Sequence, residues 1–182
     1  ASREHQPFLE LAHRIDKETS GCLVLAKTRR ALLDAQQSLQ DATSMKEYVL
    51  LVKGQWQVKN QRIEHAIDKH ADSAAGAKMI VDQHGKQAVS IFSTIELFTH
   101  NSLIKAAIET GRTHQIRVHA QQEGYPLVGD KRYGDFAHNR EVAKRGLKRM
   151  FLHATHLKLK LLDLSQNYEF TAPMPSELKT LC

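Results

Sequence analysis

The strongest constraint on the fold is a pair of strand-like segments in the middle of the chain. Residues 89–97 read VSIFSTIEL, residues 103–109 read LIKAAIE, and the polar turn sequence THNS lies between them. Both segments are rich in the β-branched and apolar residues that favour strands. Strands joined by so short a connection can pair only in the antiparallel sense, because a parallel pair needs a crossover of a dozen or more residues. The chain is therefore expected to contain an antiparallel sheet.

Further strands and two helices are predicted around this hairpin. Six more segments have the short apolar or alternating pattern of strands, namely residues 22–26, 47–52, 61–67, 78–81, 157–161 and 168–171. One helix is predicted over residues 29–39, capped by Thr28, and another over residues 113–122, ending before Gly124 and Pro126. Because strands outnumber helices and occur in runs, the predicted class is α+β, with a mixed, mainly antiparallel sheet as the core and flanking helices.

Two of these segments carry specific expectations about burial. The apolar run CLVLA at residues 22–26 follows a serine-glycine turn, and we expect it to be a buried strand. In the first helix, Leu32, Leu33, Gln36 and Leu39 are expected to share the stripe that faces the core.

Length and composition indicate one globular domain over residues 1–182. Hydrophobic residues make up 41% of the chain and charged residues 25%, close to the average for soluble domains. The longest apolar runs are far shorter than the roughly 18 residues of a membrane helix, so no membrane partner is expected. Cys22 and Cys182 form neither a disulfide framework nor a CxxC pair, which favours a reducing cytoplasm.

An excess of positive charge indicates a polyanionic partner. Lysine and arginine number 26 against 20 acidic residues, which gives a net charge of +6 and an isoelectric point near 9.4. The excess is uneven, with Lys144, Arg145, Lys148 and Arg149 crowded into one short stretch. Nucleic acid is the commonest polyanion in a cytoplasm, although a solvated basic face explains the charge equally well.

Two further stretches concentrate chemically useful side chains. HRIDKETSG at residues 13–21 places Asp16 between Arg14 and Lys17, and GRTHQIRVH at residues 111–119 supplies two arginines and two histidines directly after a predicted strand. A lone aspartate between basic residues is usually a turn or surface residue. An arginine of the second stretch placed beside Asp16 would keep it ionised, and a permanent carboxylate can serve as nucleophile or base.

The order of five motifs resembles the RluA-type pseudouridine synthases, and within them the RluC-like enzymes of large-subunit ribosomal RNA. The motifs are HRIDKETSG, KEYVLLVKG at residues 46–54, GRTHQIRVH, the GD and RYG pieces within residues 129–134, and RMFLHA at residues 149–154. Each motif alone is a weak indicator, but five in the family's order are a strong one. The resemblance implies the pseudouridine synthase fold and extends from Leu11 to APMP at residues 172–175.

The resemblance also implies a role for five residues. Asp16 falls on the catalytic aspartate, and Arg14 on the arginine that helps to displace the target nucleotide. Tyr48 falls on the tyrosine that stacks on uracil, and Arg117 on the arginine that pairs with the catalytic carboxylate. Leu152 falls on an apolar residue of the same pocket. Taken singly, Tyr48 and Leu152 would be core residues and Arg117 a structural ion pair.

The implied reaction detaches uracil from C1′ of its ribose, turns it, and rejoins it through C5. This isomerisation needs no metal and no redox cofactor, and the implied partner is 23S ribosomal RNA, bound by a monomer. Family members also carry an earlier strand motif, Lys-Pro-x-Gly, and many carry an S4 RNA-binding domain. Residues 1–182 are therefore expected to be the catalytic domain of a longer protein, without that strand and that domain.

Other functions stay open. An enzyme of the same family could act on other ribosomal RNA sites or on transfer RNA. A non-catalytic RNA-binding module would explain the charge but not Asp16, whereas a carboxylate-nucleophile hydrolase would explain Asp16 but lacks a second acid and a glycine-rich phosphate loop. The eleven histidines form no HExxH motif and no other metal-site spacing, so no metal is expected.

Overall fold

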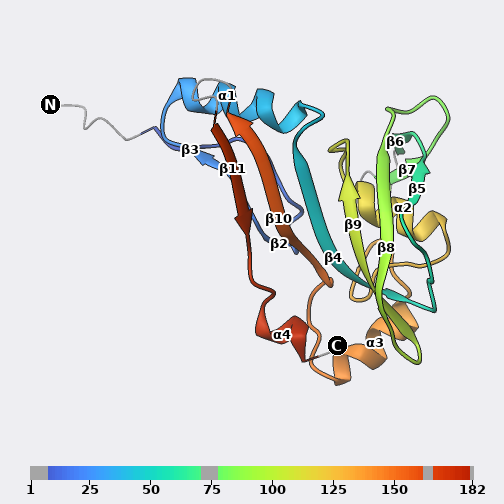
Figure 1. Ribbon diagram of the computed structural model, residues 1–182. Coiled ribbons are helices and arrows are strands. Elements are labelled where there is room, and N and C mark those ends of the chain that lie inside the picture. Colours follow the sequence, from blue (N-terminus) through green and yellow to red (C-terminus); the bar gives the residue numbers. More distant parts are fainter. Residues whose placement is uncertain (1–7, 71–77, 162–165, 181–182) are drawn as a thin grey trace, which may run out of the picture.

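A mixed, mainly antiparallel sheet organises the described part of the molecule (Figure 1). The computed structural model describes residues 8–70, 78–161 and 166–180. Six strands lie in the order β11 (Gln166–Thr171), β10 (Leu152–Leu161), β4 (Met45–Lys53), β9 (Asn101–Ile108), β8 (Val89–Leu97) and β5 (Gln61–Glu64). The seventh, β2 (Ser20–Gly21), pairs with β10 in the parallel sense. The predicted class, α+β with a mainly antiparallel sheet, is confirmed.

Among the described residues, two small strand pairs and four helices surround this sheet. The pairs are β1 (Glu10–Leu11) with β3 (Leu25–Ala26), and β6 (Ile67–His70) with β7 (Lys78–Val81). The helices are α1 (Arg29–Gln40), α2 (Gln115–Gln122), α3 (Phe136–Lys144) and α4 (Ser176–Lys179). Figure 1 shows α1 near one end of the strands and α3 and α4 near the other. In the described part of the chain, no helix is long and apolar enough to cross a membrane.

Side chains of β4 alternate between two apolar clusters, one on each face of the sheet. Leu50 and Val52 pack in the cluster that includes Ile116 of α2. Val49 and Leu51 pack on the opposite face, where α3 and α4 contribute Val142 and Leu178. The other buried members of this second cluster are Leu103, Val128, Leu147 and Phe151. This period of two is the pattern of a strand buried on both faces. It leaves β4 as a rigid central platform.

The central hairpin is where the sequence predicts it. The strand predicted over residues 89–97 coincides with β8, and its partner β9 begins at Asn101 rather than at residue 103. The two strands pair antiparallel from Ser90 opposite Ile108 onward, with a register shift between Thr94 and Glu96. The strongest expectation from the sequence is thus confirmed.

The prediction of a buried strand over residues 22–26 is wrong. Only Leu25–Ala26 forms a strand, and the Leu23 and Leu25 side chains are 38% and 49% exposed. This segment pairs with the short β1 outside the main sheet, so one of its faces meets solvent. The apolar run alone does not show which sheet a segment joins.

The first helix is confirmed, but its buried stripe differs from the prediction. The Thr28 side chain accepts a hydrogen bond from the Ala31 N–H and caps the helix. Leu33 is 53% exposed, and Ala35 and Ser38 lie in the buried stripe beside Leu32 and Leu39. Leu33 is adjacent in sequence to Leu32 and therefore projects about 100° away around the helix.

One further strand and one helix also differ from the prediction. The strand predicted over residues 61–67 is split, because β5 ends at Glu64 and Ile67 pairs instead with Val81 in the small sheet. Helix α3 was not predicted; its N-cap is Asp135, whose carboxylate accepts the His138 N–H. The short apolar stripe of α3 buries only Val142, which is too little periodicity to recognise from sequence.

Helix α2 is anchored to the sheet by a fully buried histidine. The His119 Nε2 donates to the carbonyl oxygen of His65 at 2.9 Å, and its Nδ1 lies 3.0 Å from the Ser90 hydroxyl. With Nε2 protonated, Nδ1 accepts from Ser90 and the ring is neutral. Burial lowers the pKa of His119 below its ordinary value.

This burial predicts a stability that falls in mild acid. A histidine whose pKa is lowered in the folded state binds its proton mainly in the unfolded state. Its contribution to the free energy of unfolding is therefore complete above the unfolded pKa of about 6.5 and is lost as the pH falls below that value. Urea denaturation between about pH 8 and about pH 5.5 should show this loss. A His119→Gln variant should be less stable at the higher pH but should show a shallower pH dependence. An unchanged slope would contradict the role of His119.

Candidate active site

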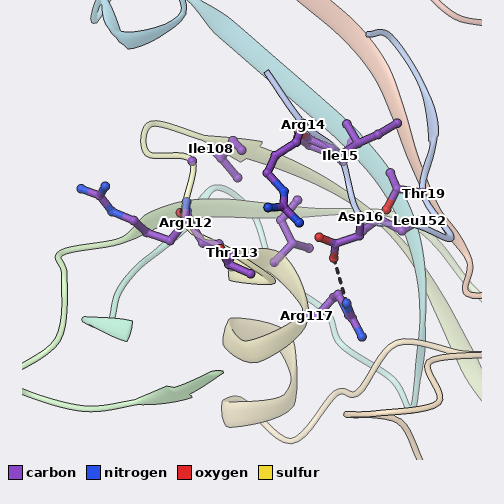
Figure 2. A pocket seen from close by; sticks show the side chains of 13 residues that line it. Arg14, Ile15, Asp16, Thr19, Ile108, Arg112, Thr113, Arg117 and Leu152 are labelled. Carbon is purple, nitrogen blue, oxygen red and sulfur yellow. Dashed lines mark hydrogen bonds and ion pairs between the residues drawn. The ribbon is translucent and has the colours of Figure 1, made fainter. Parts of the chain in front are cut away.

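The five residues singled out from the sequence line one pocket. Arg14 and Asp16 come from the loop between β1 and β2, Tyr48 from β4, Arg117 from α2 and Leu152 from the start of β10. The pocket has a volume of about 100 Å³. Figure 2 shows the Asp16 carboxylate directed at Arg117, with Arg14 extending beside it. Segments more than a hundred residues apart in sequence therefore meet at one carboxylate.

The Asp16 loop is held by hydrogen bonds on its C-terminal side. The Thr19 N–H donates to the Asp16 carbonyl oxygen at 2.9 Å, which closes a turn. The Glu18 carboxylate accepts the Met150 N–H at 3.2 Å and pairs with the Lys131 ammonium at 2.8 Å. These contacts fasten the loop to the segment that precedes β10.

Gly21 lets this loop dock directly on the sheet. Its φ is +116°, and a Cβ at this position would lie 2.1 Å from the carbonyl oxygen of Ala154. Only glycine is compatible with such an approach and such a φ. The serine-glycine end of the first motif is thus required by the parallel pairing of β2 with β10.

Ser20 and His153 lock the same joint. The buried His153 lies with Nε2 3.1 Å from the Ala172 carbonyl oxygen, to which it donates, and with Nδ1 2.8 Å from the Ser20 hydroxyl. Nδ1 therefore accepts from Ser20, whose oxygen in turn accepts from Arg149 at 2.8 Å. His153, the histidine of the RMFLHA motif, is structural in this arrangement because it fixes the position of the Asp16 loop relative to β10.

Arg117 is shared between two carboxylates. Its Nη1 donates to Asp16 Oδ2 at 2.9 Å, and its Nε and Nη2 donate to the two oxygens of Asp130 at 2.7 and 3.0 Å. The ring of Tyr133 packs against the same guanidinium, 4.8 Å from its central carbon. Burial opposes the charge of Arg117, but the bonds to Asp130 and Asp16 raise its pKa. The guanidinium is therefore permanently charged and fixed in orientation.

Asp130 is a residue that the sequence reasoning left without a role. Its carboxylate is fully buried, and Oδ1 also accepts the N–H groups of Arg132 and Tyr133 at 2.8 and 3.0 Å. Burial opposes ionisation, but Arg117 and these N–H donors lower the pKa of Asp130. The signal available in the sequence was its place in the GD piece of the fourth motif, which by spacing alone indicates no partner.

Tyr48 lies where the sheet carries its smallest side chains. Ala106 of β9 and Ala154 of β10 are its direct cross-strand partners, so both neighbours on its face are alanines. The phenol ring packs against the apolar cluster that includes Ile116 and lines the pocket together with Asp16. Burial and the nearby Asp16 raise the pKa of Tyr48 to about 12, and the hydroxyl keeps its proton at neutral pH.

The loop that leads into α2 is fixed by one buried amide. Gln115 Oε1 accepts from the Thr110 hydroxyl at 2.7 Å and from the Arg112 N–H at 3.0 Å. Its Nε2 donates to the Val89 carbonyl oxygen at 2.8 Å and to Ser90 Oγ at 3.0 Å. All four hydrogen-bonding positions of the amide are used. Helix α2 consequently begins at Gln115, two residues later than predicted.

Basic side chains surround the pocket and its neighbour. Arg14 lines both this pocket and an adjoining cavity of about 420 Å³, whose walls also contain Lys17, Lys131 and Arg132. Arg112 lies at the opposite rim of the first pocket. Leu152, only 4% exposed, supplies an apolar wall. The first pocket combines one carboxylate and one aromatic ring with several basic side chains, which suits a polyanion that presents a flat ring.

Comparison with known proteins points in the same direction. The family model described as RNA pseudouridylate synthase matches residues 1–122. Ribosomal large subunit pseudouridine synthase C of Haemophilus ducreyi is 40% identical over 181 residues, which are 100% of this chain and 57% of that protein. Its counterpart in Escherichia coli K12 is 38% identical, over 98% of this chain and 57% of that protein. The chain thus spans little more than half the length of these relatives.

Solved structures give a similar result. The structure titled Human RNA Pseudouridylate Synthase Domain Containing 1 is 28% identical and superposes with a TM-score of 0.79, covering 92% of this chain and 70% of that one. The family model covers about two thirds of the chain, including Asp16, Tyr48 and Arg117. Since the motifs, the fold and this match agree, the chain belongs to the RNA pseudouridylate synthase family.

Proposed function

We propose that the protein carrying this chain isomerises specific uridines to pseudouridine in large-subunit (23S) ribosomal RNA, with Asp16 as its catalytic residue. The observation that carries the proposal is the convergence of Arg14, Asp16, Tyr48, Arg117 and Leu152 on one pocket, with Asp16 bound to Arg117. The bacterial relatives are named for the ribosomal large subunit, which supports this RNA over transfer RNA.

The position of Asp16 within a pocket favours a target base that leaves its helix. A base that is stacked and paired in a duplex cannot reach Asp16 and Tyr48, so we expect the uridine to be flipped out at a cost of a few kcal/mol. Arg14, which is exposed at the mouth of the pocket, is placed to occupy the space that the base vacates. The ring of Tyr48 can then stack on uracil, an interaction worth roughly 1–3 kcal/mol per base.

The reaction itself is balanced without a second reagent. The N1–C1′ bond breaks, uracil turns, and a C5–C1′ bond forms, while C5 loses a proton and N1 gains one. No electrons are gained or lost, so no redox cofactor is required. Asp16 supplies a carboxylate whose Oδ2 is bound by Arg117 and whose Oδ1 keeps a lone pair for the reacting group.

One copy of the chain provides every group invoked here. All five pocket residues belong to it, in keeping with a monomeric enzyme. Ribosomal RNA as substrate places the enzyme in the cytoplasm. The basic walls formed by Lys17, Lys131 and Arg132 would hold phosphates and position the RNA without reading its sequence.

Replacement of the carboxylate tests the proposal directly. Asp16→Asn in the intact protein should abolish pseudouridine formation, because the amide is neither nucleophilic nor basic, while RNA affinity should stay close to the wild-type value. Release of tritium from C5-labelled uridine in ribosomal RNA measures the reaction, and filter binding measures affinity. Asp68→Asn, at an exposed carboxylate on β6, is the matched control and should be fully active.

Three outcomes of this experiment are informative. Wild-type turnover by Asp16→Asn would remove Asp16 from the chemistry. A wild-type protein that binds RNA but modifies none would favour the non-catalytic RNA-binding module. Modification of transfer RNA alone would keep the reaction and change the substrate.

The stacking role of Tyr48 predicts a difference between two variants. Tyr48→Ala removes the ring and should lower turnover by about tenfold or more, since stacking is worth roughly 1–3 kcal/mol. Tyr48→Phe keeps the ring between the same two alanines and should retain most of the activity. Single-turnover rates on ribosomal RNA provide the measurement. Equal rates for Tyr48→Ala and the wild type would rule out stacking.

The double ion pair of Arg117 predicts a large effect of Asp130→Asn. The variant leaves a buried guanidinium with one carboxylate instead of two, and breaking a buried pair costs about 3–5 kcal/mol. Urea denaturation should show a loss of that order, together with reduced turnover. Asp135→Asn is the matched control: its pair with Lys53 is at the surface and asparagine also caps helices, so a change within about 1 kcal/mol is expected. Similar losses in both variants would contradict the role of Asp130.

A further inference from the structure

We infer that His114 is a positioning residue for Asp16, holding through its Nε2–H the carboxylate oxygen that Arg117 leaves free, and that the Tyr133 hydroxyl sets the orientation of its ring. The inference rests on the proposed function, since it assigns a role within that reaction. It concerns a residue of the third motif to which the sequence reasoning gave no role.

The two oxygens of Asp16 face different partners. Oδ2 accepts from Arg117 Nη1 at 2.9 Å, and Oδ1 lies 3.9 Å from His114 Nε2. The second distance is longer than a hydrogen bond. Such contacts in free enzymes commonly tighten when substrate is bound. His114 therefore lies opposite Arg117 as the second group that can restrict rotation of the carboxylate.

The hydrogen bonds around Tyr133 allow its hydroxyl to set the tautomer of His114. The Tyr133 hydroxyl oxygen accepts the Met79 N–H at 3.0 Å, and the same oxygen is 2.8 Å from His114 Nδ1. When the hydroxyl donates its proton to Nδ1, the proton of neutral His114 is on Nε2, the nitrogen that faces Asp16. Burial and the nearby Arg117 lower the pKa of His114, which favours this neutral form.

Tyr133 also connects His114 with Arg117. Its ring packs on the Arg117 guanidinium, and its own N–H donates to Asp130, the other partner of that arginine. A single segment, residues 130–133, thus supports both groups that face Asp16. A displacement of this segment would move both contacts together.

The backbone of His114 adopts a conformation that is uncommon for residues other than glycine. Its φ is +56°, in the left-handed region that residues other than glycine rarely adopt. Gln115, anchored by four hydrogen bonds, begins the helix immediately after it. With this backbone conformation at the start of α2, the imidazole lies with Nε2 toward Asp16 Oδ1.

His114 lies beside the base pocket rather than in its lining. It contributes to the adjoining cavity, together with Asp16 and Arg117, whereas the pocket that contains Tyr48 and Leu152 is lined without it. It therefore acts on the reaction through Asp16 and does not contact the base. Loss of its Nε2–H should consequently change kcat and leave KM close to the wild-type value.

The test is a pair of substitutions that separate the two ring nitrogens. His114→Asn tolerates the left-handed backbone and keeps an acceptor near Tyr133, but it has no group at the position of Nε2. We expect kcat for pseudouridine formation in ribosomal RNA to fall about 10- to 100-fold, as for loss of one hydrogen bond to a charged group, with KM within about twofold. His114→Gln, whose amide nitrogen can reach the position of Nε2, should recover part of the loss.

Tyr133→Phe tests the second half of the inference. It keeps the ring on Arg117 and removes only the hydroxyl, so kcat should fall by a smaller factor than in His114→Asn. The double variant Tyr133→Phe/His114→Asn should be no slower than His114→Asn alone, because the hydroxyl acts through the imidazole. If kcat of the double variant instead fell by the product of the two single-variant factors, Tyr133 would act independently of His114. His84→Asn, at an exposed turn, is the control and should be as active as the wild type.

Failure of the inference and failure of the proposed function give different results. A wild-type protein that forms no pseudouridine in any RNA defeats the proposed function. A wild-type enzyme that is active while His114→Asn retains its kcat defeats the inference alone. A fall in kcat that is matched by a lower urea midpoint, with no recovery in His114→Gln, would make His114 structural and also overturn the inference.

Discussion

The buried guanidinium of Arg117, shared between Asp16 and Asp130, is the interaction on which the site depends. Asp130 is fully buried and has two backbone N–H donors in addition to Arg117, so its position is determined by the main chain. Arg117 transmits that position to Asp16, which is 19% exposed. A carboxylate at the mouth of a pocket is thereby held in one orientation while one of its oxygens remains available for chemistry.

The sheet supplies the other half of the site. Residues 49–52 of β4 are buried on alternating faces, and Tyr48 directly precedes them, opposite one alanine on each neighbouring strand. Strand β10 fixes the Asp16 loop through the close approach of Gly21 to Ala154. Both sides of the pocket are thus built on the same pair of strands.

Local structure was predictable where periodicity or capping is strong. The hairpin of β8 and β9, the helix capped by Thr28 and the alternation of leucines in β10 all follow from side-chain patterns within a few residues. Residues 22–26 show the limit, because an apolar run is equally compatible with a central strand and with an exposed pair at the margin. Helix α3 shows a second limit of prediction from sequence, since a single buried valine produces no recognisable apolar stripe.

The amino-acid sequence by itself determined the family, the class of fold and the five residues that line the pocket, because these follow from local patterns and from the order of motifs. Only the tertiary structure decided that Arg117 serves two carboxylates, that Asp130 is one of them, and that His114 faces the free oxygen of Asp16. The contact between Arg117 and Asp16 spans 101 residues of chain. Spacing along the sequence carries no information about such a contact, which arises when the sheet brings distant loops to the same end.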